Sequence, residues 1–138
     1  MKITELHKVS KSKYGNLITH GALLQPHELK TVLYLNEFGL DIELMLPSYI
    51  PHSNNPDLEM LGTTWEMKSP RSYREDTIKK RFRKAKHQSD GHSIFDLRNI
   101  TKDYTAVKNF LLKLFESTRG MKRLIMIEKD GRVFDYQK

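Results

Sequence analysis

Helix-like and strand-like stretches alternate along most of this 138-residue chain, and this order constrains the fold more than any single motif. Apolar residues recur every three or four positions in three stretches, which predicts helices over 26–38, 74–88 and 103–117. Strand-like stretches lie between and after them, over 40–46, 57–61, 65–69, 93–97, 123–127 and 132–136. This order predicts an α/β (α+β) fold in which helices cover the faces of a mixed central β-sheet.

Residues 26–138 form the expected domain, and its first helix carries clear boundary signals. Pro26 suits the first position of a helix, and Gly39 suits its end. The apolar residues between them predict a mostly buried helix. Residues 1–25 contain only a weak strand pattern at 16–19, so we expect an N-terminal arm of uncertain order.

The charge of the chain points to a polyanionic partner. The net charge is +7 and the sequence pI is near 9.6. No cysteine is present, which excludes a disulfide framework and a thiolate metal site. No run of 18 apolar residues occurs, and no helical pattern has the broad apolar face that inserts into a membrane surface. Nucleic acid is therefore the expected partner, and no membrane is expected.

The stretch from Pro56 to Pro70 carries the residues best suited to chemistry. Gly62 marks a turn between two short strands, so a hairpin brings Asp57 beside Glu66. Glu66 and Lys68 point to one face of their strand because side chains alternate. Two carboxylates beside one ammonium group suit Mg²⁺ or Mn²⁺ and an attacking water.

This arrangement resembles the PD-(D/E)XK nuclease superfamily, whose signature stands here as Pro56-Asp57 followed by Glu66-Met67-Lys68. A closer resemblance covers residues from about Glu28 to Val133. There the chain looks like the tRNA-cleaving C-terminal toxin domain of bacterial contact-dependent inhibition proteins. The matching pieces are the helix ending at 38–39 with its following strand, the hairpin, the basic helix 78–90 and the strand 94–97.

The resemblance implies a catalytic and metal-binding set around Mg²⁺ or Mn²⁺. Its metal ligands would be Asp57, Glu66 and the backbone carbonyl of Met67, and Lys68 would act on the attacking water. An acid from the preceding helix often joins such sites, and the candidates here are Glu28 first and Glu37 second. Asp96, in an apolar strand, is expected to be structural.

The helix that follows the hairpin is strongly basic. Its apolar stripe consists of Ile78, Phe82 and Ala85, and six positive charges fall within residues 79–86. We expect this face to bind substrate phosphates, although a merely solvated face would have the same composition. The predicted substrate-binding residues are Lys79, Lys80, Arg83, Lys84 and Gln88.

Several choices stay open at this point. The resemblance favours RNA, and specifically tRNA, as the substrate, with a DNA endonuclease as the runner-up and a non-catalytic nucleic-acid-binding protein as a further alternative. It also implies a cognate immunity protein, action in the cytoplasm, and delivery from another cell within a larger secreted protein. Because the chain begins with Met1, a free-standing relative carried by a phage or mobile element is the other possibility.

Overall fold

The computed structural model describes residues 1–46 and 56–138. The sequence over 47–56 is rich in turn-forming residues and predicts a loop, which lies, except for Pro56, outside the described residues. The strands are β1 (Lys2–Leu6), β2 (Leu17–Ile18), β3 (Ile42–Leu44), β4 (Leu58–Met60), β5 (Thr63–Lys68), β6 (His92–Asp96), β7 (Arg123–Ile127) and β8 (Val133–Gln137). The helices are α1 (Pro26–Asn36), α2 (Glu75–Gln88) and α3 (Tyr104–Ser117), with a 3₁₀ turn, η1, at Lys11–Lys13.

All the strands join one mixed sheet in the order β1-β8-β7-β6-β5-β4-β3-β2. Strands β5, β6 and β7 run parallel to one another, and β2 runs parallel to β3. The remaining neighbours are antiparallel. Parallel neighbours need a crossover connection, and α2 and α3 provide it for the central strands. The predicted mixed sheet with flanking helices is confirmed.

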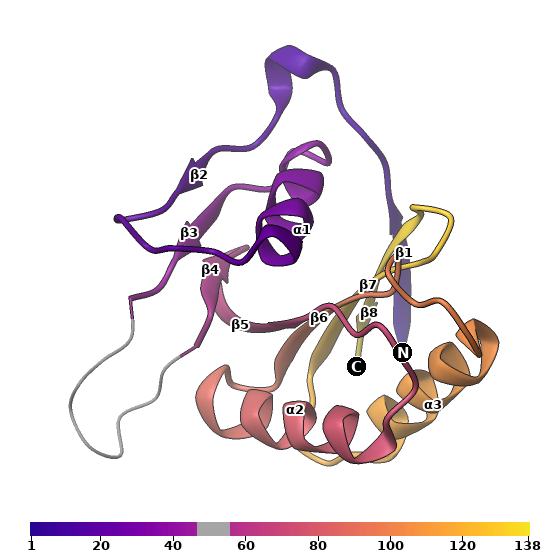
Figure 1. Cartoon of the computed structure of the whole chain (residues 1–138). Helices are drawn as coiled ribbons and strands as arrows, with labels where there is room; N and C mark the ends of the chain where they lie inside the picture. Colours follow the sequence, from indigo (N-terminus) through magenta and orange to yellow (C-terminus); the bar gives the residue numbers. More distant parts are fainter. Residues whose placement is uncertain (47–55) are drawn as a thin grey trace.

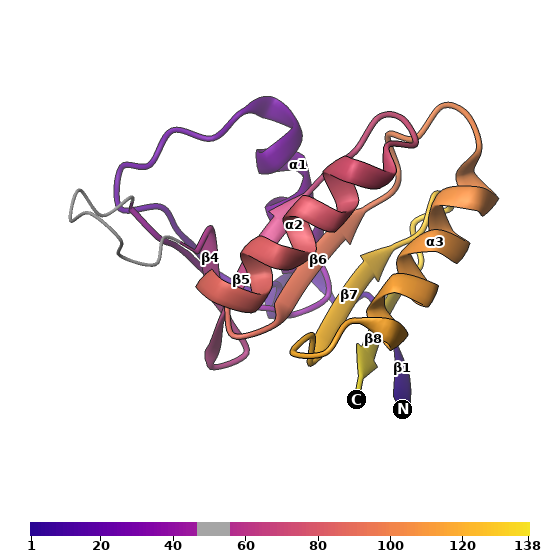
Figure 2. The same ribbon diagram turned by 90° about the horizontal axis from the view of Figure 1, so that it is seen from below.

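The helices form a layer on each face of the sheet (Figures 1 and 2). Helices α2 and α3 lie side by side on one face, where their apolar stripes pack with Phe95, Leu124 and Met126. Helix α1 covers the other face and packs with Trp65, Ile94 and other sheet residues. Successive strand residues alternate between these two cores, as a sheet covered on both faces requires.

Helix α1 begins at Pro26 as predicted, but it is only half buried. Its inward face consists of Thr31, Val32, Leu35 and Asn36, whereas Leu29 and Leu33 are exposed. The prediction of a mostly buried helix was wrong, because these two leucines project from the side that the sheet does not cover.

The N-terminal segment contributes to both edges of the sheet. β1 pairs along its whole length with β8 at one edge, and β2 pairs with β3 at the other. The weak strand pattern at 16–19 is confirmed as β2. Residues 7–16 run between the two edges past the C-terminal end of α1, where the amides of Val9 and Gly15 donate to the carbonyls of Glu37 and Asn36 (Figure 1). The chain ends thus lie near each other at the β1–β8 edge.

None of the helices that the structure describes is long and apolar enough to cross a membrane.

Candidate active site

The hairpin β4–β5 turns through two left-handed residues, Leu61 and Gly62, with φ of 55° and 76°. Glycine takes this conformation without cost, and its place here explains why the turn falls at the predicted position. The indole Nε1 of Trp65 donates a hydrogen bond to the carbonyl of Met60 at 2.7 Å. This buried contact fixes the register of the two strands.

That register brings Asp57 beside Glu66, as the sequence predicts. Leu58 pairs with Trp65 at the end of the ladder, and Asp57 and Glu66 follow next to this last pair. The Asp57 amide donates to the carbonyl of Trp65 at 3.1 Å, and the Met67 amide donates to Asp57 Oδ2 at 2.8 Å. The Asp57 carboxylate is therefore held at the end of the hairpin, next to the backbone of Met67.

Glu66 is a buried carboxylate with an incomplete hydrogen-bond shell. Its side chain is 1% exposed, and the Ser89 hydroxyl donates to Oε1 at 3.4 Å. Its Oε2 atom lies 3.6 Å from Arg81, but it has no hydrogen-bond partner within the part of the chain that the structure describes. Burial and the nearby carboxyl of Asp57 raise the pKa of Glu66 to about 7, against the opposing charges of Lys84 and Arg81.

Lys68 and Glu28 approach the same place from different elements. Lys68 follows Glu66 by two residues and points to the same side of the sheet, toward α2. Glu28 lies in the first turn of α1, where its Oε1 accepts a hydrogen bond from the Gln25 amide at 2.9 Å. Burial and the Arg81 charge lower the pKa of Lys68, and the charge of Glu28 opposes this shift.

Two neighbouring hollows connect these groups. A small hollow of about 50 Å³ is lined by His27, Glu28, Met67, Lys68, Ser69 and Arg81. A larger one of about 440 Å³ contains Asp57 and apolar residues of β3 and of the segment before α1. Glu28 and Met67 line both hollows. The structure therefore brings Asp57, Glu66, Lys68 and Glu28 to one region, whereas Glu37 lies at the other end of α1 and pairs with Lys8 at 3.5 Å.

The site suits a divalent cation chemically. A buried carboxylate oxygen without a donor, next to a second carboxylate, is an arrangement that a cation would stabilise. The candidate ligands are Asp57, Glu66 and the carbonyl of Met67. In the described ranges, no three side chains of the His, Cys, Asp and Glu types gather closely enough to hold a metal by themselves. A cation here would thus depend on backbone oxygen and water as well as the two carboxylates, which is usual for Mg²⁺.

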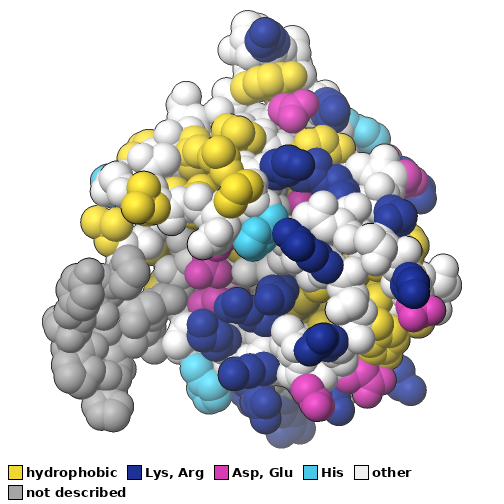
Figure 3. Space-filling model, in the orientation of Figure 1, with side chains coloured by type: hydrophobic (Ala, Val, Ile, Leu, Met, Phe, Trp, Pro, Cys, Tyr) yellow, Lys and Arg dark blue, Asp and Glu magenta, His cyan; other side chains and the backbone are white. Residues whose placement is uncertain are grey.

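Helix α2 presents two different basic faces. Arg81, Lys84 and Gln88 recur at helical spacing and face the hairpin, because Arg81 and Lys84 both act on the charge of Glu66. Gln88 precedes Ser89, and its Oε1 atom is buried. The outer face consists of the exposed side chains of Lys79, Lys80, Arg83 and Lys86. Figure 3 shows lysine and arginine side chains gathered over α2, bordered by acidic side chains near the hairpin.

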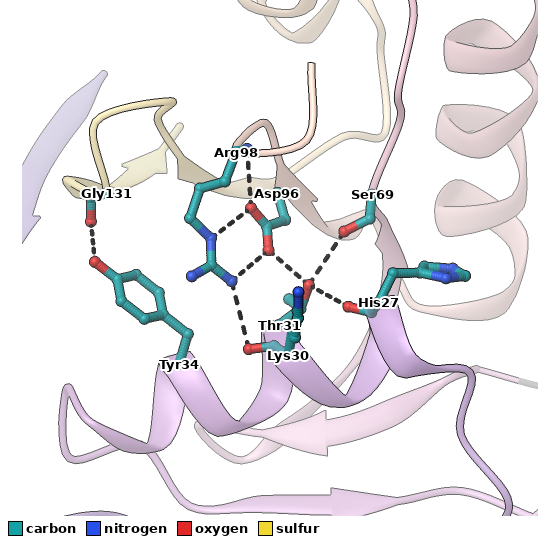
Figure 4. Close-up of polar contacts among 8 residues, drawn as sticks. All are labelled: His27, Lys30, Thr31, Tyr34, Ser69, Asp96, Arg98 and Gly131. Atoms are coloured by element: carbon teal, nitrogen blue, oxygen red, sulfur yellow. Dashed lines mark hydrogen bonds and ion pairs between the residues drawn. The ribbon is translucent and has the colours of Figure 1, made fainter. Parts of the chain in front are cut away.

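Asp96 belongs to a structural network beside the site, as expected (Figure 4). Its carboxylate accepts from Arg98 Nε at 3.0 Å and from the second guanidinium nitrogen at 2.8 Å. It also accepts from the Thr31 hydroxyl at 2.7 Å, and that hydroxyl lies 3.1 Å from Ser69 Oγ. The guanidinium of Arg98 stacks 4.0 Å above the Tyr34 ring. The network thereby joins α1 to the ends of β5 and β6, and it fixes Glu28 relative to Lys68.

Sequence reasoning missed several residues of the site, namely Arg81, His27, Ser69 and Ser89. Arg81 was counted only among the charges of α2. Its position beside the buried stripe of Ile78, Phe82 and Ala85, in line with Gln88, was a usable signal for an inward-facing cation. Ser89 and Ser69 carried no such signal, since both lie at the ends of elements whose orientation depends on tertiary packing.

A third hollow, of about 480 Å³, lies elsewhere, between the start of β3 and the β4–β5 turn. Its lining includes the carboxylates of Asp41, Glu43 and Glu59. These charges would repel a phosphate group, so this hollow does not suit a polyanionic substrate.

Comparisons with known proteins agree with this architecture. No curated protein sequence matches the chain significantly. A solved structure described as a CdiA-CT/CdiI toxin and immunity complex from Burkholderia pseudomallei is similar, with a TM-score of 0.65 and 16% sequence identity. The match covers 90% of this chain and 100% of the other. The model of the contact-dependent growth inhibition CdiA C-terminal domain matches residues 54–133, which include the hairpin, α2, β6, α3 and β7. The chain therefore belongs to the family of CdiA C-terminal domains.

Proposed function

We propose that this protein is a divalent-metal-dependent endonuclease with a PD-(D/E)XK site, which hydrolyses phosphodiester bonds of RNA, specifically tRNA, and acts as a toxin. The observation that carries the proposal is the hairpin site. Asp57 is held at the Met67 amide beside the buried, unsatisfied carboxylate of Glu66, and Lys68 lies on the same face. The basic face of α2 adjoins it and supports a polyanionic substrate.

Each residue would have a definite part in the reaction. Asp57, Glu66 and the Met67 carbonyl would hold Mg²⁺ or Mn²⁺. When bound, this ion would neutralise charge on the scissile phosphate and make water a better nucleophile. Lys68 would keep the attacking water in line and stabilise the charge that develops on the phosphate. Glu28 would orient Lys68, with which it shares the small hollow.

The remaining predicted binding residues would hold the substrate backbone. Lys84 and Gln88 would contact nucleotides next to the cleaved bond, because they lie on the site-facing side of α2. Lys79, Lys80 and Arg83 would contact more distant phosphates from the outer face. Contacts to the phosphate backbone do not distinguish one nucleotide sequence from another. The choice of cleavage site would therefore depend on the shape of the tRNA and on bases placed in the hollow that Asp57 lines.

Incubation of the purified protein with total tRNA, with Mg²⁺ or with EDTA, tests the proposal. We expect discrete fragments that require Mg²⁺ and appear equally with Arg119→Gln, a control at an exposed site after α3. Glu66→Gln should lower the cleavage rate by at least about 100-fold, the range for loss of one stabiliser of transition-state charge. Asp57→Asn should act similarly.

Duplex DNA in a parallel reaction separates the two substrate classes. Intact tRNA with cleaved DNA would replace the RNA assignment with a DNA endonuclease. Binding of either nucleic acid without turnover would indicate a protein that keeps the fold for binding alone. Cleavage that persists in EDTA or in Glu66→Gln would contradict the metal site.

We further propose that an immunity protein binds this domain and that the domain acts in the cytoplasm of a cell that receives it within a larger secreted protein. The structurally similar toxin forms a complex with an immunity protein, which supports the first point. Because the site borders the basic face of α2, an acidic surface would fit over it. Competition between such a protein and tRNA for the domain would test this arrangement.

A further inference from the structure

We propose that Arg81 alternates between two anionic partners, holding Glu66 before the divalent cation binds and the scissile phosphate afterwards. This inference rests on the proposed nuclease function and adds a catalytic residue from α2 to the hairpin site. It assigns Arg81 a role different from that of the other cations of the helix, which would only bind the substrate backbone.

The position of Arg81 separates it from its neighbours. Its side chain is 28% exposed, whereas Lys79, Lys80, Arg83, Lys84 and Lys86 are exposed. Arg81 lines the small hollow that Lys68 and Glu28 also line. Lys84 also faces Glu66, but Arg81 is the one that shares this hollow with Lys68, so an incoming phosphate would meet both Arg81 and Lys68 there.

The contact between Arg81 and Glu66 differs from the two arginine–aspartate pairs that brace the sheet of this protein. Arg98 binds Asp96 through two hydrogen bonds of 2.8 and 3.0 Å, and Arg123 binds Asp135 through two of 2.6 and 3.0 Å. Arg81 instead lies 3.6 Å from Glu66 Oε2, which keeps no hydrogen-bond donor in the described part of the chain. A pair selected for rigidity would close this gap, as the other two do.

A loose pair of this kind is suited to exchange. While no cation is present, Arg81 offsets part of the charge of a carboxylate that is 1% exposed. With its charge engaged in a metal site, the Glu66 carboxylate would attract the guanidinium less strongly. The guanidinium can then turn to a phosphate oxygen, to which its fork of donors binds in a bidentate manner. No bond forms or breaks in this exchange, and only the partner of the guanidinium changes.

Arg81→Gln distinguishes this exchange from a purely structural role through two opposite effects. Without substrate, we expect Mn²⁺ to bind Arg81→Gln at least about fivefold more tightly than the unaltered protein at pH 8.5, because a competing positive charge has gone. With tRNA, we expect kcat to fall by about 100-fold or more and KM to change little. Arg81→Lys keeps the positive charge but lacks the forked donors of the guanidinium. Its Mn²⁺ affinity and its kcat should lie between those of the unaltered protein and those of Arg81→Gln.

Arg119→Gln is the matched control, an exposed arginine changed in the same way at a distance from the hairpin. It should change neither the Mn²⁺ affinity nor kcat, and thermal unfolding of each variant establishes that it is folded. Unchanged or weaker Mn²⁺ binding in Arg81→Gln would overturn the exchange, and so would a kcat like that of the control. If the unaltered protein cleaves no nucleic acid, the nuclease proposal fails, while the Mn²⁺ titration alone still decides whether Arg81 competes with a cation.

Discussion

The burial of Glu66 lowers the stability of its charged form, and the proposed chemistry would need this charged form. A carboxylate buried next to Asp57 is stable as an ion only when a cation or a set of donors compensates it. Arg81 and Ser89 supply part of this compensation at distances of 3.6 and 3.4 Å. The remaining deficit appears as a pKa raised to about 7.

This raised pKa of Glu66 predicts how stability changes with pH. The folded protein retains a proton that the unfolded chain releases near pH 4.5, so stability should fall as pH rises from about 4.5 to about 7. The loss amounts to about 3 kcal/mol. Glu66→Gln stays neutral and should become more stable than the unaltered protein by this amount at pH 8.5, but not at pH 4. Urea unfolding at pH 4 and at pH 8.5 measures this difference in the free energy of unfolding between the two proteins.

Mg²⁺ supplies the control for the Glu66 prediction. It should restore the stability of the unaltered protein at pH 8.5 and leave Glu66→Gln almost unchanged, since the variant lacks one of the two proposed carboxylate ligands. A stability difference between the two proteins that does not depend on pH would contradict the raised pKa.

Helix α2 performs two tasks along the same fourteen residues. Its buried stripe packs into the core formed with α3, while Arg81 and Lys84 approach Glu66. The outer cations remain in solvent, where their effect on a distant phosphate depends on ionic strength. Under the proposed function, the outer face of the helix would attract the substrate, and the inner face would take part in the chemistry.

This separation predicts that outer-face charges control salt dependence and leave turnover unchanged. In Lys80→Gln/Arg83→Gln, the slope of log K against log salt for tRNA binding should fall in magnitude by roughly 1–2, because about one counterion is released per phosphate contact. The value of kcat at saturating tRNA should not change. Filter binding over a salt series measures the slope, with Lys113→Gln/Arg119→Gln on and after α3 as the control. An equal slope in both double variants would indicate that the outer face is only solvated.

At the scale of the whole molecule, the geometry of the candidate site depends on how α1 is attached to the sheet. Glu28 can join the site only if α1 keeps its position over β5 and β6. The network of Asp96, Arg98, Thr31 and Ser69 makes this attachment with buried, directional contacts (Figure 4). A packed apolar interface alone would allow the helix to slide by small amounts.

Loss of Asp96 should therefore weaken the entire fold. Asp96→Ala leaves Arg98 without its carboxylate and is expected to lower the free energy of unfolding by about 3–5 kcal/mol. Replacing both partners, as in Asp96→Ala/Arg98→Met, should be less harmful than the single change, because no unpaired charge stays behind. Urea unfolding of the unaltered protein, the single variant and the double variant measures these free energies. A loss below about 1 kcal/mol in Asp96→Ala would show that the network contributes little.

Contacts close in sequence were the ones that the sequence by itself determined. The approach of Asp57 to Glu66 spans one tight turn, and Gly62 together with the alternation of side chains was enough to predict it. The apolar stripe of α2 was predicted for the same reason, since helical periodicity is a local property.

Tertiary structure alone decided the rest. The pairing of β1 with β8 joins the two ends of the chain, and the pairing of β2 with β3 spans a whole helix. The approach of Arg81 to Glu66 depends on how α2 lies on the sheet, and that of Glu28 to Lys68 depends on how α1 lies on the opposite face. A local pattern specifies which side of an element is apolar, but not which element covers it. That choice is made by the packing of the two cores.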